Sequence, residues 1–281
     1  MKKSRWVEIA KNRSEVRFQV LNEYLNDNGF ASEVNFVEVE PAQFEDKLKE
    51  VTQEYDVIRI GSPYGQSVTS LFDGQSTELR TLKAADCLWK VKDRWTLMSA
   101  NHIGMQRIVL DIGKQLDLET SVLVVGAGAG ARVCISAFIR VGVKKINITN
   151  KFVEQAKELI DDLRKTYFGV EFEFIPEERL VLLPGTNGVL VNTTPLAVGN
   201  DLLKGLYYFN FLKSPGIVMD FTFVPIDTPL VMEAEQIGIR AVRGYEISSW
   251  GDMAWVESCF GLHLKREEYC ERLRKKVSEI E

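Results

Sequence analysis

The feature that most constrains the fold is a continuous apolar run followed at once by three closely spaced glycines. Val122–Val125 is typical of a strand buried on both faces of a parallel sheet. Gly126, Gly128 and Gly130 come next, and a helical pattern follows over Ala131–Val141. Glycines let the backbone turn tightly and approach a phosphate, which then lies at the N-terminus of the helix. The segment therefore predicts a dinucleotide site near the middle of the chain.

The composition excludes several classes of partner. The chain of 281 residues is long enough for two domains, and its apolar fraction of 45% and charged fraction of 27% are typical of soluble globular proteins. A net charge of −5 with scattered Lys and Arg argues against a nucleic-acid partner. No apolar run approaches the roughly 20 residues of a membrane helix. The charged N-terminus leaves no apolar segment for a signal peptide, so we expect no membrane partner.

The cysteines and histidines indicate the cellular compartment and limit the metal sites that the chain can form. Cys87, Cys134, Cys259 and Cys270 show neither a metal-ligand spacing nor a paired framework. We expect free thiols in a reducing cytoplasm. The sequence holds two histidines, which excludes a His-rich metal centre, and we assign no metal.

The second half of the chain alternates strand and helix in the manner of a doubly wound Rossmann fold. The predicted strands are Val122–Val125, Lys145–Thr149, Glu171–Ile175, Val189–Asn192, Ile217–Asp220 and Ile239–Val242, and the predicted helices are Ala131–Val141 and Val153–Tyr167. We place this dinucleotide-binding domain at residues 106–245.

The first half predicts a separate α/β domain. The predicted helices are Arg13–Asn28, Pro41–Val51 and Ile103–Leu116, the predicted strands are Val34–Val39 and Tyr55–Ile60, and a hairpin joins Cys87–Val91 to Trp95–Ser99 around Lys92–Arg94. The tail Trp250–Ile280 is helical in pattern. We place a substrate-binding domain at residues 1–105 and expect the C-terminal helices, residues 246–281, to complete it.

The end of the second Rossmann strand bears on the choice of cofactor. Sites selective for NAD usually place Asp or Glu there to bind the ribose 2′-hydroxyl, whereas this chain has Asn150-Lys151. Lys151, or Arg132 at the start of the preceding helix, can pair with a 2′-phosphate, which favours NADP over NAD. The alternatives are that Lys151 is a solvated surface lysine and that the glycines serve only close helix–strand packing.

A further polar segment, Asn192–Leu196, follows another short strand. Groups at the carboxyl ends of strands face the crevice where ligands bind in open α/β sheets. A plain exit from strand to turn is the alternative. The residues expected to hold the cofactor are Gly126, Ala127, Gly128, Ala129, Gly130, Ala131, Arg132, Asn150, Lys151, Asn192, Thr193, Thr194, Pro195 and Gly244.

Taken together these segments resemble the shikimate dehydrogenase family. The matching segments are Gly126–Arg132, Thr149–Lys151, Asn192–Leu196, Asp220–Pro225 and Thr228–Leu230. The resemblance covers most of the chain, with specific motifs in the second half and only positional agreement in the first. It implies a substrate domain joined to a Rossmann domain, and hydride transfer between NAD(P) and a small hydroxy or keto compound.

The chain departs from the family where the chemistry takes place. The family motif that carries its lysine aligns with Arg59–Gly65, so Gly65 replaces that lysine. The family aspartate aligns with Ile103. Proton transfer to or from a hydroxyl needs a positioned titratable group, and neither of the two family groups is present. We therefore expect a substrate other than shikimate.

Other residues of the first half are candidates for the missing roles. His102 lies beside the lost aspartate and is the candidate catalytic acid or base. The candidate substrate-binding residues are Ser14, Arg59, Tyr64, Asp86 and Asn101. The competing interpretations are a hydrogen-bonded structural histidine, and ordinary salt-bridging roles for Arg59 and Asp86.

Three functions remain open from the sequence. The first is an NAD(P)-dependent oxidoreductase on this scaffold with a different small-molecule substrate. The second is a catalytically inactive nucleotide-binding pseudoenzyme or sensor. The third is a true shikimate dehydrogenase with a displaced acid/base group. We expect a monomer or a homodimer in each case.

Overall fold

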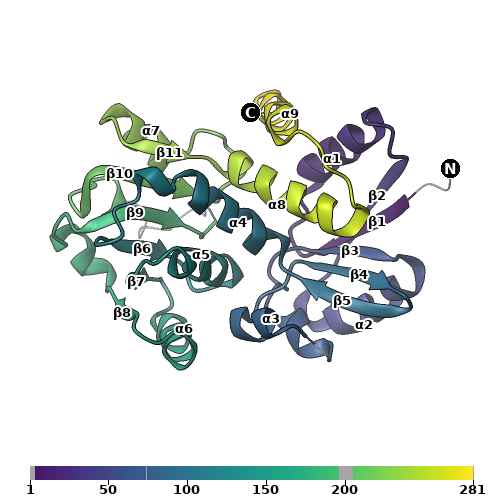
Figure 1. Cartoon of the computed structure of the whole chain (residues 1–281), viewed down its shortest axis with the longest axis horizontal. Coiled ribbons are helices and arrows are strands. Elements are labelled where there is room, and N and C mark those ends of the chain that lie inside the picture. The colour runs from purple at the N-terminus through teal and green to yellow at the C-terminus, as the bar shows by residue number, and fades with distance from the viewer. Residues whose placement is uncertain (1–3, 74, 196–204, 281) are drawn as a thin grey trace. The chain divides into compact units, whose positions relative to one another are not determined.

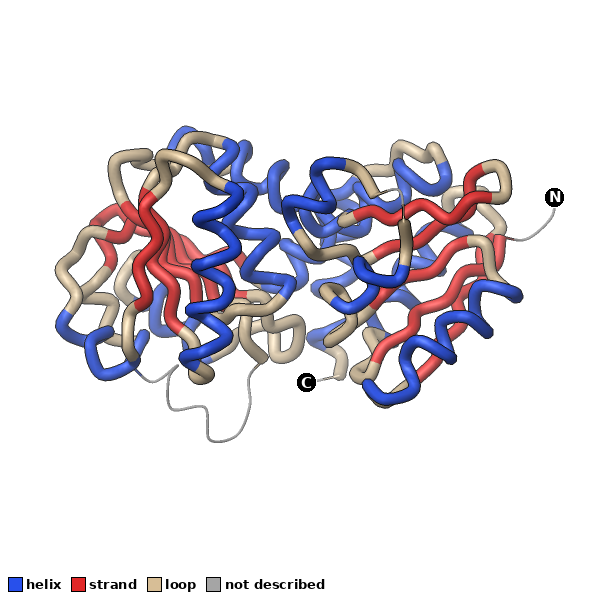
Figure 2. Tube along the Cα trace, turned by 90° about the horizontal axis from the view of Figure 1, so that it is seen from below, coloured by secondary structure: helices blue, strands red, loops and turns tan. Residues whose placement is uncertain are grey.

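The computed structural model describes residues 4–73, 75–195 and 205–280, which form two compact units. Unit 1 contains Met1–Gly104 and Ser249–Ile280, and unit 2 contains Met105–Ser248 (Figure 1). Each unit is an α/β layer structure with strands in a sheet and helices beside it (Figure 2). Two helices, α4 (Ala100–Asp111) and α8 (Gly244–Phe260), run from one unit into the other.

The described part of unit 1 forms a five-stranded sheet in the order β2-β1-β3-β4-β5. Its strands are β1 (Ser4–Ala10), β2 (Ser32–Glu38), β3 (Val57–Ile60), β4 (Cys87–Val91) and β5 (Arg94–Met98). The first three are parallel, and β4 and β5 are antiparallel to their neighbours. The carboxyl ends of β1, β3 and β5 and the start of β4 therefore meet at one edge of this sheet.

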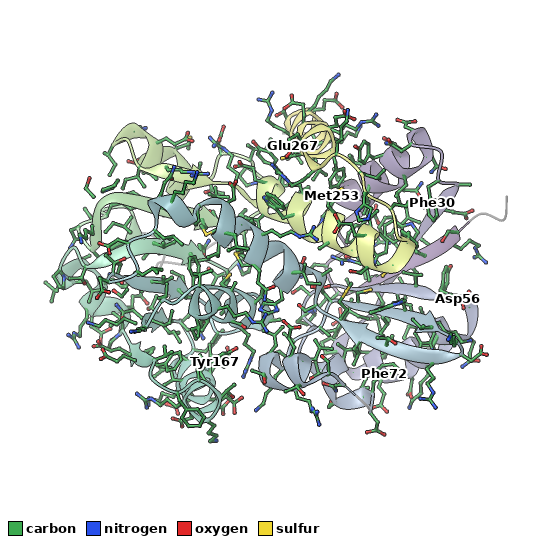
Figure 3. The ribbon with its side chains drawn as sticks, viewed as in Figure 1. Phe30, Asp56, Phe72, Tyr167, Met253 and Glu267 are labelled. Carbon is green, nitrogen blue, oxygen red and sulfur yellow. The ribbon has the colours of Figure 1, made fainter. Side chains whose placement is uncertain are left out.

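Alternate residues of β1 face two different sets of helices. Val7 and Ile9 pack in one core with Phe44 and other apolar residues of α2 (Phe44–Glu54). Trp6 points to the other side, where its ring contacts Phe18 of α1 (Glu15–Asp27) and Trp255 of α8 at centroid distances of 5.5 and 4.7 Å. The C-terminal helix α9 (Arg266–Ser278) lies against α1. Figure 3 marks this side of unit 1 with Met253 on α8 and Glu267 on α9. The short helix α3 (Thr77–Leu82) completes the unit.

The described part of unit 2 forms a six-stranded parallel sheet in the order β11-β10-β9-β6-β7-β8. Its elements are β6 (Ser121–Val125), α5 (Ala129–Arg140), β7 (Lys145–Thr149), α6 (Val153–Thr166), β8 (Glu171–Phe174), β9 (Asn187–Asn192), β10 (Leu212–Asp220), α7 (Pro229–Gln236) and β11 (Arg240–Val242). This is the strand order of the dinucleotide-binding fold, as the sequence predicted.

The structure corrects several predicted elements. The strand β1 was not predicted, because Glu8 interrupts its apolar run. The first helix begins at Glu15 rather than Arg13, and Pro41–Gln43 form a 3₁₀ turn before α2. The hairpin turn is shorter than predicted, because Lys92 and Asp93 both adopt positive φ values of 47° and 63° and Arg94 already belongs to β5. Such a two-residue turn matches the twist of the flanking strands.

Several helices outside the Rossmann core also differ from the prediction. Helix α4 starts at Ala100 rather than Ile103 and ends at Asp111. The tail predicted as helical contains two helices, α8 and α9, and Gly261, with a φ of 66°, follows the end of α8. Helix α7 was missed although Thr228 caps it and Pro229 is its first residue. Within residues 4–73, 75–195 and 205–280, no helix is long and apolar enough to cross a bilayer.

Candidate functional site

The glycine loop lies where the strand order of unit 2 reverses. From β6 the chain moves outward to β7 and β8 on one side, and β9, β10 and β11 lie on the other. In such sheets, ligands bind beyond the carboxyl ends of the strands at this point. Gly126 leaves β6 with a φ of 114°, and its N–H donates to the carbonyl of Thr149 at 2.8 Å. A Cβ on Gly126 would lie 2.3 Å from Thr193 Oγ1, so packing and backbone conformation both require glycine here.

Gly128 differs from Gly126 in what surrounds it. It is exposed at the N-cap of α5, and a Cβ built on it would meet no described atom within 4 Å. Neither packing nor a positive φ explains glycine at this position. The first N–H groups of a helix have no partner inside the helix, and they form a site for a negatively charged group. The open space at Gly128, in front of α5, therefore fits the pyrophosphate of a dinucleotide.

A hydrogen-bonded chain fixes the Asn192–Pro195 segment beside this loop. Thr193 is tied to β6, because both its N–H and its Oγ1 donate to the carbonyl of Val125, at 2.9 and 2.8 Å. Asn192 is fully buried; its Nδ2 donates to Asp220 at 3.0 Å and its Oδ1 accepts from the hydroxyl of Thr194 at 2.7 Å. Thr228 Oγ1 donates to the other oxygen of Asp220 at 2.7 Å. Pro195 ends the described segment, and Leu196 lies outside the described residues.

The two cations considered for a 2′-phosphate occupy different environments. Arg132 is 8% exposed, and its Nη2 contacts Asp162 Oδ2 at 2.9 Å. Lys151 is exposed just beyond β7 and forms no ion pair within the described part of the chain. The side-chain Nδ2 of Asn150 donates to the carbonyl of Phe152, two residues further along the chain, at 2.9 Å. Of the two cations, Lys151 is therefore the one available to a phosphate.

Gly244 is enclosed by backbone of its own unit. A Cβ on it would lie 2.1 Å from the carbonyl oxygen of Thr222. Packing alone therefore requires glycine there. Its assignment to the cofactor stays a prediction.

In unit 1, one edge of the sheet gathers most of the residues considered for substrate binding. Ser14 follows β1, Gly65 follows β3, Asp86 precedes β4, and Asn101 follows β5. Ser14 is the N-cap of α1, and its side chain makes no capping hydrogen bond. Asn101 Oδ1 lies close to Gly251 of α8, where an added Cβ would be 2.6 Å away.

Arg59 and Asp86 belong to a buried charged cluster. Arg59 is 2% exposed; its Nη1 donates to Asp86 Oδ1 at 3.3 Å and its Nη2 lies 3.7 Å from Asp252 Oδ1. Asp86 also accepts from the N–H groups of Ala100 and Asn101 at 2.9 and 2.8 Å, which starts helix α4. Asp252 Oδ1 and Oδ2 accept from Arg17 at 2.7 and 2.8 Å. Both candidate residues are thus engaged inside the unit, in the salt-bridging role that the sequence left open.

Tyr64 is also engaged inside unit 1. It is 2% exposed, it stacks on Phe44 with ring centroids 4.0 Å apart, and its hydroxyl donates to the carbonyl of Val39. These contacts place it in the hydrophobic core. We therefore do not include it among the residues proposed to hold a substrate.

His102 lies in the first turn of α4 and is 1% exposed. Its Nδ1 is 3.2 Å from Oε1 of Glu78, whose side chain is 44% exposed. Nδ1 is therefore the ring nitrogen that faces the carboxylate of Glu78. Glu78 did not figure in the sequence interpretation, because nothing in the sequence spacing brings α3 to α4.

Glu8 is a buried acid that the sequence interpretation missed. It is 1% exposed in the middle of β1; Oε2 accepts from the N–H of Ser14 at 2.7 Å, while Oε1 has no hydrogen-bond partner among the described residues. Burial raises the pKa of Glu8 above its usual value, against the lowering effect of the Ser14 hydrogen bond and the charges of Arg17 and Arg59. A lone acidic residue inside the run Trp6–Ala10 was the available signal.

Among the residues that the structure describes, no group of three or more His, Cys, Asp or Glu side chains is arranged to hold a metal ion.

Comparison with known proteins finds similarity to one family. The sequence model of the family described as "Shikimate / quinate 5-dehydrogenase" matches residues 109–178. A curated relative, the shikimate dehydrogenase (NADP(+)) of Caldicellulosiruptor saccharolyticus, is 25% identical over 262 residues, which span 87% of this chain and 91% of the relative.

Solved structures share the fold. The shikimate 5-dehydrogenase of Thermus thermophilus, crystallised with shikimate, superposes with a TM-score of 0.81 at 18% identity, covering 98% of this chain and 99% of its own. The ligand-free 5-ketofructose reductase of a Gluconobacter species superposes with a TM-score of 0.78 at 15% identity, with coverage of 98% and 99%.

Proposed function

We propose that this chain, which belongs to the shikimate dehydrogenase family, transfers hydride between NADP and a small hydroxy or keto compound other than shikimate. The family relation supports an oxidoreductase acting on a CH–OH group. The identity of the substrate, and the residues that replace the family's acid/base pair, form the new part of the proposal.

The observation that carries the proposal is the His102–Glu78 pair. The two positions that hold the family's lysine and aspartate are Gly65 and Ile103 in this chain. Neither side chain can exchange a proton. His102 is adjacent to Ile103, and Glu78 orients its ring through the 3.2 Å contact at Nδ1. A histidine held in one orientation by a carboxylate is a typical general acid or base.

The cofactor half of the proposal rests on unit 2. The open space at Gly128 and the first N–H groups of α5 fit a pyrophosphate, and Lys151 fits a 2′-phosphate as a charged partner. Thr193 and Asn192 form a fixed wall beside the loop. When bound, the nicotinamide supplies or accepts the hydride, which no side chain of this chain can do.

In this proposal the side chains of unit 1 handle the proton. His102 accepts the hydroxyl proton of an alcohol at Nε2 as the alcohol is oxidised, or donates a proton to the oxygen of a ketone as it is reduced. Glu78 stabilises the imidazolium that the first direction creates. Ser14 and Asn101 are the remaining polar candidates for holding the substrate at the edge of the sheet.

The other residues at this edge of the sheet support a substrate other than shikimate. Arg59, the cation considered for a carboxylate, is occupied by Asp86 and Asp252. A neutral polyol or keto compound needs no such cation, and hydroxyl and amide groups can bind it by hydrogen bonds.

The burial of candidate substrate-binding residues favours a second candidate function, a nucleotide-binding pseudoenzyme or sensor. Arg59, Asp86 and Tyr64 are all used inside unit 1, and both family acid/base positions lack a titratable group. In this second candidate function, the chain binds the nucleotide cofactor but does not catalyse a reaction.

The first test is a titration of the purified chain with NADPH and with NADH, in which energy transfer from tryptophan to nicotinamide reports binding. The second test is a screen of polyols, keto sugars and hydroxy acids with the cofactor that binds more tightly. Saturable NADPH binding with turnover of a compound other than shikimate supports the oxidoreductase. Saturable binding with no turnover across the screen supports the pseudoenzyme. Efficient oxidation of shikimate contradicts the proposed substrate, and absence of binding to both nucleotides contradicts the cofactor site.

A further inference from the structure

Two cysteines that are distant in sequence lie in contact inside unit 1. Cys87 Sγ in β4 and Cys259 Sγ near the end of α8 are 3.6 Å apart, although 172 residues separate them in the chain. Both are free thiols. Met253, labelled in Figure 3, lies earlier on the same helix as Cys259. A disulfide bond is about 2.05 Å long, so the two sulfurs must approach each other by roughly 1.5 Å to form one.

The two thiols differ in access. Cys87 is fully buried, whereas Cys259 is partly exposed. A dissolved oxidant therefore meets Cys259 first, and Cys87 is the partner that it cannot reach directly. Burial raises the pKa of the Cys87 thiol well above its usual value, so Cys87 is not itself a reactive nucleophile toward solvent oxidants.

The surroundings of the pair connect it to the buried charged cluster. Trp255 Nε1 donates to Cys87 Sγ at 3.1 Å, and the guanidinium of Arg59 lies over the Trp255 ring at 5.4 Å. Arg59 is also the register partner of Cys87 between β3 and β4. A covalent change at Cys87 therefore occurs next to a tryptophan that reports on it.

We propose that Cys87 and Cys259 form an oxidisable dithiol, a modification site that a peroxide converts into an intramolecular disulfide joining β4 to α8. This inference does not depend on the dehydrogenase function. It assigns a role to two of the four cysteines that the sequence left as separate free thiols.

The reaction balances with one peroxide per chain. The thiolate of Cys259 attacks one oxygen of hydrogen peroxide, an S–O bond forms, the O–O bond breaks, and the released hydroxide takes up a proton to become water. The thiol of Cys87 then loses its proton, its sulfur attacks the sulfur of Cys259, the S–S bond forms, and the S–O bond breaks with release of a second water. The two sulfurs lose two electrons, and the peroxide gains them.

The experiment uses the full chain with stoichiometric hydrogen peroxide. Remaining thiols are then alkylated, and peptides are mapped by mass spectrometry without reduction. We expect a Cys87–Cys259 linked peptide that disappears on treatment with dithiothreitol, and a reversible fall in tryptophan fluorescence because a disulfide next to Trp255 quenches it. A Cys259→Ser variant should slow the oxidation of Cys87 at least tenfold. The matched control is Cys270→Ser, since Cys270 is also a partly exposed cysteine on a C-terminal helix, and it should behave as the parent.

The peptide mapping of the parent chain is informative even if a variant fails to fold. Three outcomes overturn the proposal. One is conversion of Cys259 to a sulfinic acid while Cys87 stays reduced. Another is a disulfide that involves Cys270 or joins two chains. The third is oxidation of Cys87 at an unchanged rate in the Cys259→Ser variant.

Discussion

Arg59 lies directly beside Glu8 in the parallel register of β1 and β3, yet the ion pairs of its guanidinium are with Asp86 and Asp252. Glu8 therefore stands next to a cation that is already occupied. Its Oε1 has no hydrogen-bond partner among the residues that the structure describes. The cluster of Glu8, Arg17, Arg59, Asp86 and Asp252 is electrically balanced when Glu8 carries its proton, because two cations then face two carboxylates.

This arrangement predicts that stability falls as the pH rises. Burial raises the pKa of Glu8 in the folded chain above the ordinary value of 4.5, so the folded state holds the proton more tightly than the unfolded state does. The resulting stabilisation is complete below the unfolded pKa and is lost as the pH rises through the folded pKa. A Glu8→Gln variant, which keeps the shape of the protonated acid, should remove this loss and be at least as stable as the parent at pH 8.

Denaturant unfolding between pH 4 and pH 8 measures the effect, with Glu23→Gln on the exposed face of α1 as the control. The gain for Glu8→Gln at pH 8 is expected to be on the order of 1 kcal/mol, the cost of a buried group without a partner. A pH dependence identical to that of the parent would show that Glu8 is not the titrating group.

A substitution at Gly128 should weaken NADPH binding without changing the stability of the fold. Gly128→Ala should leave the free energy of unfolding within about 0.5 kcal/mol of the parent, because the added methyl group meets no described atom within 4 Å. It should raise the Kd for NADPH at least about tenfold, or about 1.4 kcal/mol, because the methyl group occupies the space in front of α5. Gly126→Ala, at a φ of 114° and against Thr193, should lose stability as well. Unchanged NADPH affinity in Gly128→Ala would place the pyrophosphate elsewhere.

Lys151 determines the preference between the two nucleotides in this account. Lys151→Ala should weaken NADPH binding by about tenfold, which corresponds to about 1.4 kcal/mol, and leave NADH binding unchanged, because the 2′-phosphate is the group that only NADPH has. Lys145, exposed at the opposite end of β7, is the matched control. Fluorescence titrations at two salt concentrations distinguish a direct contact from general attraction. Equal losses for both nucleotides would contradict this role.

The His102–Glu78 pair predicts a pattern in the kinetics. His102→Gln should lower kcat by roughly 10²- to 10⁴-fold, the usual contribution of a general acid or base, with NADPH affinity unchanged. Glu78→Gln should lower kcat less and shift the pH profile, because it alters the orientation and charge of the imidazole without removing it. His263→Gln, at a side chain that is 86% exposed, is the control. Undiminished turnover in His102→Gln would exclude His102 as the acid or base.

The sequence predicts unit 2 in greater detail than unit 1, for a physical reason. A parallel sheet needs long apolar strands and a glycine turn, and both are local patterns, so β6, β7 and the loop at Gly126 are visible in the sequence. Unit 1 depends on contacts between distant segments. β1 was missed because an acidic residue, Glu8, interrupts its apolar run, and the N–H of Ser14 that Glu8 accepts from lies beyond the strand.

The same reason limits the prediction of the site. Arg59 and Asp86 are polar residues at a strand end, and the sequence could not show that Asp252 and the start of α4 occupy them. The Glu78 contact of His102 and the thiol pair of Cys87 and Cys259 likewise join elements whose separation in sequence carries no signal.

Unit 2 is one continuous stretch of chain, whereas unit 1 joins segments from both sides of it, with Arg17 and Asp252 bonded across 235 residues. On the ribosome, the strands of unit 1 therefore emerge long before α8 and α9, which lie against one face of their sheet. Until α8 and α9 leave the exit tunnel, the sheet face that carries Trp6 and Glu8 has α1 beside it but lacks the cover of α8 and α9, while unit 2 already has every strand of its own sheet. The nascent chain thus carries an incompletely covered, partly charged sheet face through most of its synthesis, and the last helices to be made complete the first domain.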